Sequence, residues 1–148
     1  MSTNDQYVPS PAGWVRDQVE AYERSGGTES NTLRDTGLSI VIVTTRGHRS
    51  GKIRKTPLMR VEHEGQYALV ASQGGAPKHP YWYFNLVADP NDVQIQDGPT
   101  PLDYSVREVD GDERAIWWER AVSAFSPYAD YQMKTERRIP VFVATRRD

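Results

Sequence analysis

Cysteine is absent from the sequence, and its absence excludes disulfide bonds, thiolate catalysis, iron–sulfur clusters and cysteine-ligated zinc. Long apolar runs are absent too, since none approaches the roughly 20 residues of a transmembrane helix. The first 13 residues have neither the basic nor the apolar region of a secretory signal, so a cytoplasmic protein is expected. At 148 residues, the chain is long enough for one domain with a real core and short for two.

Acidic residues are missing from one stretch, residues 36–61, although the whole protein has a net charge of −2. Six basic side chains occupy that stretch, and the remaining 12 basic and 20 acidic residues give the rest of the chain a net charge of −8. A confined cationic patch favours a discrete anionic ligand over nucleic acid, whose binding proteins are usually basic over a whole domain. The alternative interpretation is a solvated hairpin whose charges serve solubility.

The motifs of several common catalytic classes are also absent. His48, His63 and His79 lie far apart, without the spacing of a metal-binding helix, so no metal site is expected. The serine-hydrolase motif GxSxG and the dinucleotide motif GxGxxG do not occur. The string nearest to a Walker A loop, over residues 47–52, has the wrong glycine spacing, and Ile53 stands where a hydroxyl residue belongs.

Apolar periodicity predicts a chain of short strands punctuated by helices. Six strands are expected, at residues 38–45, 53–65, 66–72, 93–96, 102–109 and 139–145. Helices are expected over residues 13–24, from Pro80 to the residue before Pro90, and from Asp110 or Asp112 to about Phe125, with a short helix or loop over 126–138. Because most connections are short, the first three strands are expected to form an antiparallel meander within a small barrel, with helices outside it.

Residues 1–30 are expected to form a polar tail and an amphipathic helix, and residues 31–148 the barrel domain. The helix places four larger apolar side chains on one side: Trp14, Val15, Val19 and Tyr22. That side can pack on the barrel, lie on a membrane surface or contact a partner. Packing on the barrel is favoured, because mixed charges make residues 11–24 a weak peripheral anchor at the inner face of a membrane.

Two segments combine glycine with positive charge. Residues 46–56 (RGHRSGKIRKT) set two glycines among basic side chains such as Lys52, and such a turn binds phosphate through backbone amides and flanking charge. Residues 72–85 contain a glycine pair that begins at Gly74, and then Lys78 beside a predicted helix N-terminus, which favours an anion. Aromatic residues follow, so the two segments together suit a cofactor with a charged tail and a planar ring. Taken singly, each is equally well explained as a hairpin turn or a core helix.

The most specific signal is the order of three segments: TTRGHRSGKIRKTPL, then SQGGAPKHPYWYFNL, then SPYADYQ followed by RIP. In this order they resemble the deazaflavin-dependent nitroreductase family, over roughly residues 36–142. Members of that family are actinobacterial split β-barrel proteins that use the reduced deazaflavin coenzyme F420. The resemblance implies a mainly β (α+β) fold, an FMN-binding-like split β-barrel of about six antiparallel strands with short helices packed outside.

The resemblance also implies a coenzyme site built from separate segments. A basic turn holds the phosphate and acidic tail: His48, Arg49 and Ser50. A second stretch follows the coenzyme groove: Arg54, Lys55, Thr56 and Pro57. A strand end lies against the ring: Val70, Ala71, Ser72 and Gln73. A helix borders the tail: Tyr81, Trp82 and Asn85. Tyr128 and Tyr131 close over the ring and the acceptor pocket, although a pair spaced in this way is often simple packing.

The implied reaction is hydride transfer from the C5 carbon of the reduced deazaflavin to an organic acceptor, a quinone such as menaquinone or a nitroaromatic compound. Ser72, Tyr128, Tyr131 or water is the candidate proton source, so the first three are the expected catalytic residues. Two residues depart from the family pattern. Gln73 stands where a member can carry lysine, and Phe125 stands where a tyrosine can occur. The missing hydroxyl argues against bulky nitroimidazoles as acceptors.

Three alternatives stay open beside this interpretation. An FMN-dependent split-barrel oxidase or reductase would use the same fold and a similar phosphate turn. A carrier would bind the deazaflavin without turnover. A nucleic-acid module is disfavoured, because the acidic remainder of the chain would repel the phosphate backbone. The sequence has no signature that decides the oligomeric state.

Overall fold

The computed structural model describes residues 6–33 and 36–147. Its strands are β1 (Ile40–Arg46), β2 (Ile53–Met59), β3 (Glu62–His63), β4 (Gln66–Val70), β5 (Val93–Gln96), β6 (Pro101–Glu108) and β7 (Val141–Arg146). Its helices are α1 (Gly13–Ser25), the short 3-10 turn η2 (Gln73–Gly75), α2 (Tyr81–Ala88), α3 (Gly111–Ala124) and α4 (Pro127–Met133).

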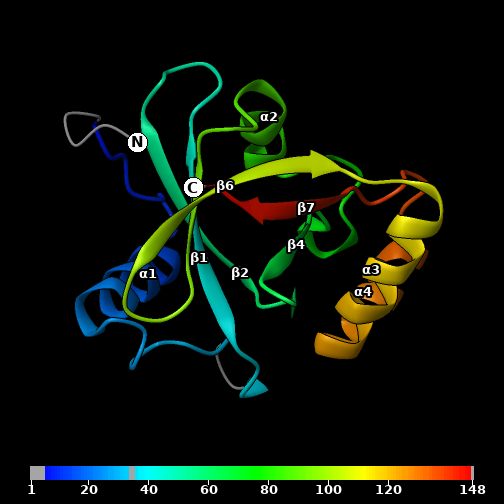
Figure 1. Ribbon diagram of the computed structural model, residues 1–148, viewed down its shortest axis with the longest axis horizontal. Coiled ribbons are helices and arrows are strands. Elements are labelled where there is room, and N and C mark those ends of the chain that lie inside the picture. The colour runs from blue at the N-terminus through cyan, green and yellow to red at the C-terminus, as the bar shows by residue number, and fades with distance from the viewer. Residues whose placement is uncertain (1–5, 34–35, 148) are drawn as a thin grey trace.

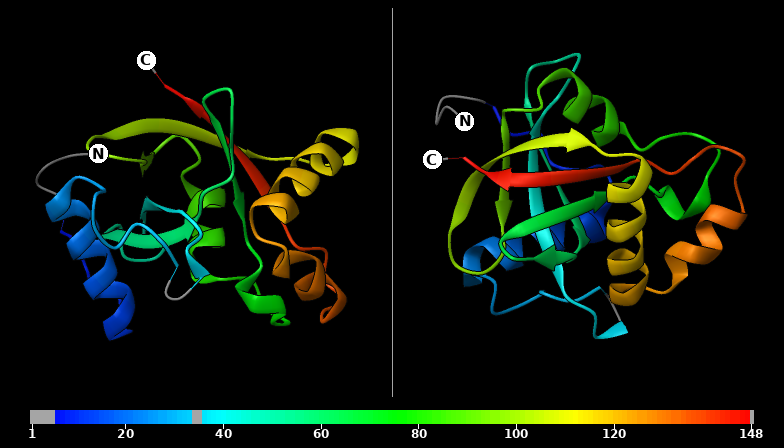
Figure 2. Two further views of the ribbon diagram at one scale, coloured as in Figure 1. Left: turned by 90° about the horizontal axis from the view of Figure 1, so that it is seen from below. Right: turned by 45° about the vertical axis from the view of Figure 1, so that its right-hand side comes forward.

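The seven named strands form one curled antiparallel sheet in the order β2-β1-β5-β6-β7-β4-β3 (Figure 1). The predicted barrel-like sheet with helices packed on it is therefore confirmed, with seven strands instead of six. Figure 2 shows α1 on one side of the strands and α3 with α4 on the other. The β2 edge and the β4–β3 end of the sheet are not paired with each other, so the curl stays open between them.

Both faces of the central strands are buried, which accounts for their continuous apolar runs. Ile40 and Ile42 of β1 belong to a core with α1, α3 and α4, whereas Val41 and Val43 belong to a second core with α2. Successive side chains of a strand point to opposite faces, so a strand covered on both sides must be apolar at every position. The run over 38–45 was predicted as a buried strand on this reasoning, and residues 40–45 confirm it.

The predicted meander of the first three strands is wrong. The run over 53–65 is not one strand: it divides into β2 and β3, which lie at opposite ends of the sheet. Among the named strands, β2 pairs with β1, while β3 pairs with β4 and β4 pairs with β7. Pro57 lies on the edge strand β2, where its missing amide hydrogen leaves no ladder bond unmade, as predicted.

The helix α1 packs on the sheet beside β2, which confirms the favoured interpretation of its apolar side. Val19 and Tyr22 are fully buried, and the helix ends at Gly26, whose φ of 64° is left-handed. The polar tail is described from residue 6, and there the Ile53 amide donates to the Gln6 carbonyl at 2.7 Å. Residues 6–8 therefore extend the β2 edge, and the earlier residues lie outside the described part. The domain boundary near residue 30 stays a prediction.

The remaining helices follow their sequence signals. α2 begins after Pro80 and buries Trp82 and Leu86, as predicted. α3 buries Trp117 and Ala121, with Phe125 at its end, and its N-cap is Asp110, although the Asp110 side chain makes no capping hydrogen bond. The segment over 126–138 contains a helix, α4. Within the described ranges, no helix combines the length and the apolar character needed to cross a membrane.

Candidate active site

A cavity of about 500 Å³ lies where the curled sheet is open, between β2 and the end of β4. This volume is within the range of ~300–1,000 Å³ that small-molecule sites occupy. Many predicted site residues line it: Thr56, Pro57, Val70, Ser72, Gln73, Gly74, Tyr81, Trp82, Tyr128 and Tyr131. Further lining residues were not predicted for the coenzyme: Trp14, Val15, Leu33, Ile40, Leu58, Met59, Pro80 and Phe125.

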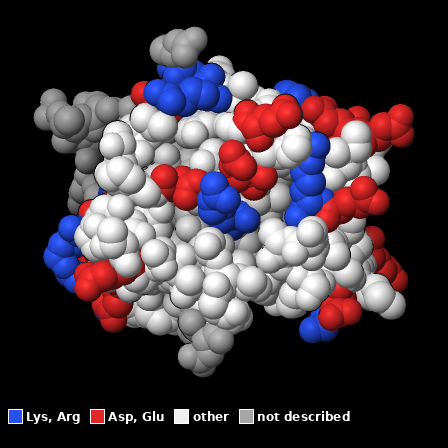
Figure 3. Space-filling model, turned by 60° about the horizontal axis from the view of Figure 1, so that its bottom comes forward, with Lys and Arg blue, Asp and Glu red and all other residues white. Residues whose placement is uncertain are grey.

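The unpredicted lining residues are mostly apolar. Trp14 and Val15 come from α1, whose apolar stripe was recognised in the sequence, but nothing in that stripe indicated which cavity it would border. Leu33 and Ile40 extend the same apolar wall. On the face shown in Figure 3, charged side chains of both signs are interspersed, and a broad uncharged area occupies its lower centre. Because most of its lining residues are apolar or aromatic, the cavity offers an apolar surface to a ligand.

One wall of the cavity is the turn that follows β4. Ser72 is buried and its hydroxyl makes no hydrogen bond to a described residue. Gln73, Gly74 and Gly75 follow with φ of 45°, 63° and 82°, three consecutive left-handed residues. Ala71, the predicted site residue before Ser72, is fully buried and does not line the cavity. Its amide donates a hydrogen bond to the Pro140 carbonyl at 2.9 Å.

The facing wall is aromatic. Tyr128 is 5% exposed, and its ring centre lies 5.0 Å from that of Phe125 and 6.2 Å from that of Tyr131. Burial raises the pKa of the Tyr128 hydroxyl, and the neighbouring Tyr131 adds to the increase. Tyr128 is therefore a neutral phenol at physiological pH, which can donate a proton or hydrogen bond and is unsuited to act as a base.

Positive charge borders the cavity through Arg54. Its guanidinium carbon lies 5.2 Å from the centre of the Tyr81 ring, and Tyr81 together with Thr56 lines the cavity. Burial raises the pKa of the Tyr81 hydroxyl, and the Arg54 charge opposes that increase. Lys55 is on the other face of β2 from Arg54 and Thr56, and its Nζ lies 2.5 Å from Oε2 of Glu23 on α1. The structure thus does not bring Lys55 together with Arg54.

The basic turn over 46–52 uses most of its own backbone donors. The Gly47 amide donates to the Lys52 carbonyl at 2.7 Å, and the Gly51 amide donates to the Gly47 carbonyl at 2.9 Å. The Lys52 amide donates to the Ser50 hydroxyl at 3.1 Å. The expectation that the glycines leave backbone amides open for a phosphate is therefore wrong for these three groups. An anion at this turn would be held mainly by side chains.

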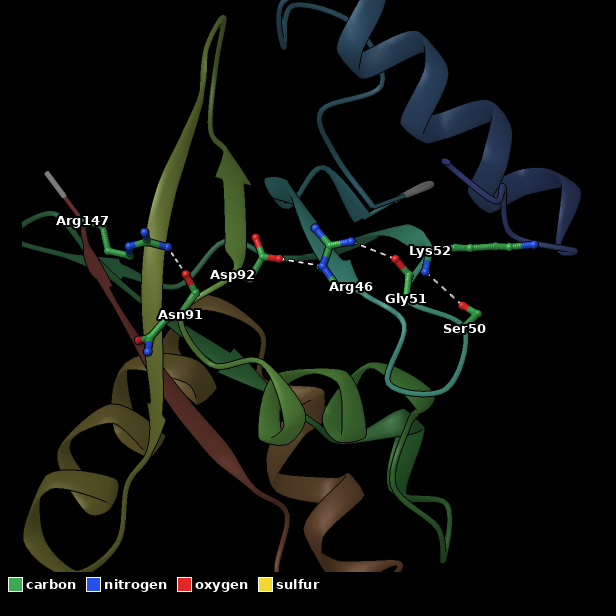
Figure 4. Close-up of polar contacts among 7 residues, drawn as sticks. All are labelled: Arg46, Ser50, Gly51, Lys52, Asn91, Asp92 and Arg147. Atoms are coloured by element: carbon green, nitrogen blue, oxygen red, sulfur yellow. Dashed lines mark hydrogen bonds and ion pairs between the residues drawn. The ribbon is translucent and has the colours of Figure 1, made fainter. Parts of the chain in front are cut away.

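Two of the basic side chains of the turn, Arg49 and Lys52, are exposed, while Arg46 is paired with other groups of the protein. Figure 4 shows Arg46 with Nε 2.8 Å from Oδ2 of Asp92 and with Nη1 donating to the Gly51 carbonyl at 2.8 Å. Arg49 and Lys52 are exposed, and their side chains make no ion pair with a described residue. Lys78, in the other predicted segment, is exposed in the same way. These three cations are available to a ligand.

Asn85, which was predicted to border the coenzyme tail, is buried between α2 and the basic turn. It is 2% exposed, and its Oδ1 accepts from the His48 amide at 2.9 Å and from His48 Nδ1 at 2.8 Å. Its Nδ2 donates to the Thr45 hydroxyl at 3.1 Å. Asn85 thus ties α2 to the basic turn that follows β1, and it positions that turn from inside.

Replacing Asn85 with alanine is expected to lower the free energy of unfolding by about 2 kcal/mol, because three hydrogen bonds at a buried site are lost. Urea denaturation measures the effect. Asn31→Ala is the matched control, since Asn31 is exposed and donates one hydrogen bond, to the Gly27 carbonyl. Equal stability of the two variants would show that Asn85 does not anchor the turn.

Arg137 was missed by sequence reasoning, although it contacts the cavity wall. It lies directly before Arg138 in the RIP segment, and its guanidinium donates to the carbonyls of Ala71, Ser72 and Ala76. These partners lie more than 60 positions away in the sequence, so no local pattern could have indicated them. Within the described residues, no three His, Cys, Asp or Glu side chains are grouped so as to hold a metal ion.

The chain is similar to known proteins in both sequence and fold. Residues 14–146 match the family of the F420H(2)-dependent quinone reductases. An F420H(2)-dependent quinone reductase of Mycobacterium tuberculosis is 34% identical over 129 residues, which cover 85% of each chain. The solved structure of an F420-H2 dependent reductase is 57% identical, with a TM-score of 0.67, over 72% of this chain and 93% of that one.

A second solved structure, described as a domain-swapped dimer, is 52% identical, with a TM-score of 0.70, and covers 92% of this chain and 100% of its own. The family match includes α1 at one end and β7 at the other, so it takes in every element that lines the cavity. The chain belongs to the F420H2-dependent quinone reductase family.

Proposed function

We propose that this protein transfers a hydride from reduced coenzyme F420 to an organic acceptor of the quinone class. The cavity at the open side of the sheet carries the proposal, because it joins apolar and aromatic walls to a cationic border at Arg54. Such walls suit a planar ring, and Arg54 with the exposed Arg49 and Lys52 suits the phosphate and acidic tail of the coenzyme. Family membership supports the same assignment.

The residues present fit the coenzyme, which when bound supplies the hydride. The chain orients the ring, for which Thr56 and Pro57 form one side and Val70, Ser72 and Gln73 the other. Arg54, Arg49 and Lys52 bind the charged part, and Lys78 adds charge at the start of α2. Asn85 and His48 act indirectly by fixing the basic turn.

A quinone that accepts a hydride also needs a proton, and the buried Tyr128 hydroxyl is the proposed source. Ser72 faces the same cavity and is the second candidate, while Tyr131 is less buried and closer to solvent. No carboxylate lines the cavity among the described residues, so a hydroxyl or water must supply the proton.

Quinones are favoured over nitroaromatic compounds as acceptors. Trp14, Val15 and Leu33 with Phe125 form an apolar surface that suits a hydrocarbon ring, and Phe125 has no hydroxyl for a nitro group. Membrane contact through residues 11–24, which would bring the enzyme to a lipid-dissolved quinone, has weaker support. Val19 and Tyr22 of that segment are buried in the protein, so they cannot also enter a lipid surface.

The test is a fluorescence titration of the purified protein with oxidised F420 and, in parallel, with FMN. Saturable binding of F420 alone, followed by oxidation of F420H2 with a soluble naphthoquinone, is expected. Binding of FMN alone would assign the protein to the flavin-dependent alternative. F420 binding without oxidation by any quinone or nitroaromatic acceptor would make it a carrier.

Arg54→Ala is expected to weaken F420 affinity by about 10-fold or more, because a charge-assisted hydrogen bond contributes about 1.5–3 kcal/mol. Lys55→Ala is the matched control: the neighbouring lysine pairs with Glu23 instead of bordering the cavity. Its F420 affinity should stay within about threefold of the wild type, since a partly exposed ion pair contributes little. Dissociation constants from the same fluorescence titration compare the two, and a larger loss for Lys55→Ala would overturn the assignment of Arg54.

A further inference from the structure

Arg137, on the connection between α4 and β7, holds the turn that borders the cavity. Its Nε donates to the Ala76 carbonyl at 2.8 Å, its Nη1 to the Ala71 carbonyl at 3.1 Å, and its Nη2 to the Ser72 carbonyl at 2.7 Å. Nη1 also lies 3.0 Å from Nδ1 of His79. Because arginine has no acceptor, Nδ1 accepts this hydrogen bond, which requires that nitrogen to be unprotonated. These contacts use four of the five N–H donors that a guanidinium has.

The three carbonyls have no sheet partner to replace Arg137. β4 and its pairing with β7 end at Val70, so Ala71 and Ser72 lie beyond the ladder although both are buried. A buried carbonyl without a partner costs about 1–3 kcal/mol. One planar, charged side chain therefore satisfies the Ala71 and Ala76 carbonyls, for which no other described residue supplies a donor. It also adds a second hydrogen bond to the Ser72 carbonyl, which accepts from the Gly75 amide at 2.9 Å. Burial lowers the pKa of the Arg137 guanidinium, but arginine remains charged at neutral pH.

The turn that Arg137 holds has an unfavourable backbone. Gln73 has a φ of 45°, and a left-handed conformation costs about 1–2 kcal/mol for a residue with a Cβ atom. Such a conformation persists only where the surroundings impose it. Ser72 and Gln73 line the cavity, so the hydrogen bonds of Arg137 help to set the position of this wall.

Arg137 is also connected to the facing wall. Its carbonyl accepts a hydrogen bond from Nε2 of Gln132 at 2.9 Å, and Gln132 is the residue after Tyr131 on α4. The Gln132 side chain also accepts from the Ile139 amide at 2.9 Å. The backbone of Arg137 is thus bonded to the helix that carries the tyrosines, while its side chain donates hydrogen bonds to the turn after β4.

We propose that Arg137 is a positioning residue that sets the Ser72 wall of the cavity against the Tyr128 and Tyr131 wall. This inference rests on the proposed function, in which the Ser72 wall orients the ring and Tyr128 supplies the proton to the acceptor. Displacement of one wall by about 1 Å can lower the rate of a reaction 100-fold. Coenzyme affinity should change less, because three of the four cations proposed for the coenzyme tail, Arg49, Lys52 and Arg54, lie on β2 and on the turn before it.

The test compares Arg137→Lys and Arg137→Ala with Arg138→Ala, a matched control in which the neighbouring exposed arginine is removed. Oxidation of F420H2 with a soluble naphthoquinone is followed by absorbance. We expect kcat to fall by about 10- to 100-fold in both Arg137 variants, while KM for F420H2 stays within about threefold. Millimolar guanidinium ion should restore part of kcat to Arg137→Ala and leave the wild type and Arg138→Ala unchanged.

Two results would overturn the proposal. The first is a folded Arg137→Lys protein with the kcat of the wild type. The second is a loss of kcat that parallels the loss of folded protein in both variants and does not respond to guanidinium. Circular dichroism of each variant measures the folded fraction, so a stability defect is separated from a positioning defect.

The proposed function fails in a different way, since the wild type itself would then not oxidise F420H2. The contact between Arg137 and His79 supplies a readout that is independent of turnover. Desolvation and the Arg137 charge lower the pKa of His79, so the pKa measured by NMR should rise in Arg137→Ala and not in Arg138→Ala. An unchanged His79 pKa in Arg137→Ala would show that the side-chain contacts of Arg137 are not formed.

Discussion

Turnover is expected to fall by about 10- to 100-fold when Tyr128 is replaced with phenylalanine, because a positioned proton donor contributes roughly this much or more. Tyr128 lines the cavity and its hydroxyl makes no hydrogen bond to a described residue, so its proton is not held by a neighbouring side chain. Phenylalanine keeps the ring contacts with Phe125 and Trp118, and coenzyme affinity should therefore change little. Steady-state kinetics with F420H2 and a naphthoquinone measure the loss.

This effect should not depend on pH over the range in which the phenol is protonated. Because burial raises the pKa of Tyr128 above its ordinary value, the phenol stays protonated from about pH 6 to 9, and the ratio of wild-type to variant turnover should be constant there. Tyr131→Phe is the comparison, and its loss should be smaller because Tyr131 is less buried and water can replace its hydroxyl. Wild-type turnover in Tyr128→Phe would remove this hydroxyl from the reaction.

Gly75→Ala is expected to destabilise the fold by about 3 kcal/mol or more, from two separate causes. A Cβ atom at residue 75 would lie 2.7 Å from the Tyr131 carbonyl oxygen and 3.0 Å from the Tyr131 Cα. These are backbone atoms of α4, so they cannot move without shifting the helix that carries the tyrosines. The φ of 82° adds left-handed strain. Urea denaturation measures the change in the free energy of unfolding.

Gly74→Ala separates the two causes. Gly74 has a φ of 63°, but a Cβ atom there would meet nothing within 4 Å. Only the strain applies, so a loss of about 1 kcal/mol is expected. If both variants lose the same stability, the close approach of α4 to the turn after β4 does not occur in solution. A larger loss at Gly75 would show that the two glycines serve different needs: Gly74 adopts a left-handed φ, and Gly75 also leaves room for the α4 backbone.

Local features of the fold were predicted where a short stretch of chain decides them. The β-branched run at Ile40 to Thr45 forms a strand covered on both sides, and the glycine pair at Gly26 ends α1 in a left-handed residue. Trp117, Ala121 and Phe125 face the core from α3 because their spacing matches the helical period. Periodicity and backbone freedom belong to neighbouring residues, so the sequence indicates them directly.

Pairing partners and contacts across long separations could not be predicted in the same way. The run at 53–65 has strand propensity throughout, yet β2 and β3 lie at opposite ends of the sheet. The reason is that β1 takes β5 as its second neighbour and β4 takes β7, so three strands stand between β1 and β4. Asn85 anchors the turn at His48 across 37 positions, a contact that neither its helix nor the family resemblance indicated. Arg137 acts across more than 60 positions.

The sequence by itself determined the mainly β fold, the family, and most of the residues that line the cavity, because these depend on local pattern and on the order of short motifs. The tertiary structure alone decided that Arg54 borders the cavity while the adjacent Lys55 pairs with Glu23. It also brought Trp14 to the cavity and Arg137 to the turn after β4. Which segment an edge-strand side chain contacts depends on parts of the chain that meet only when the sheet curls. The donor that a buried carbonyl finds depends on the same long-range contacts.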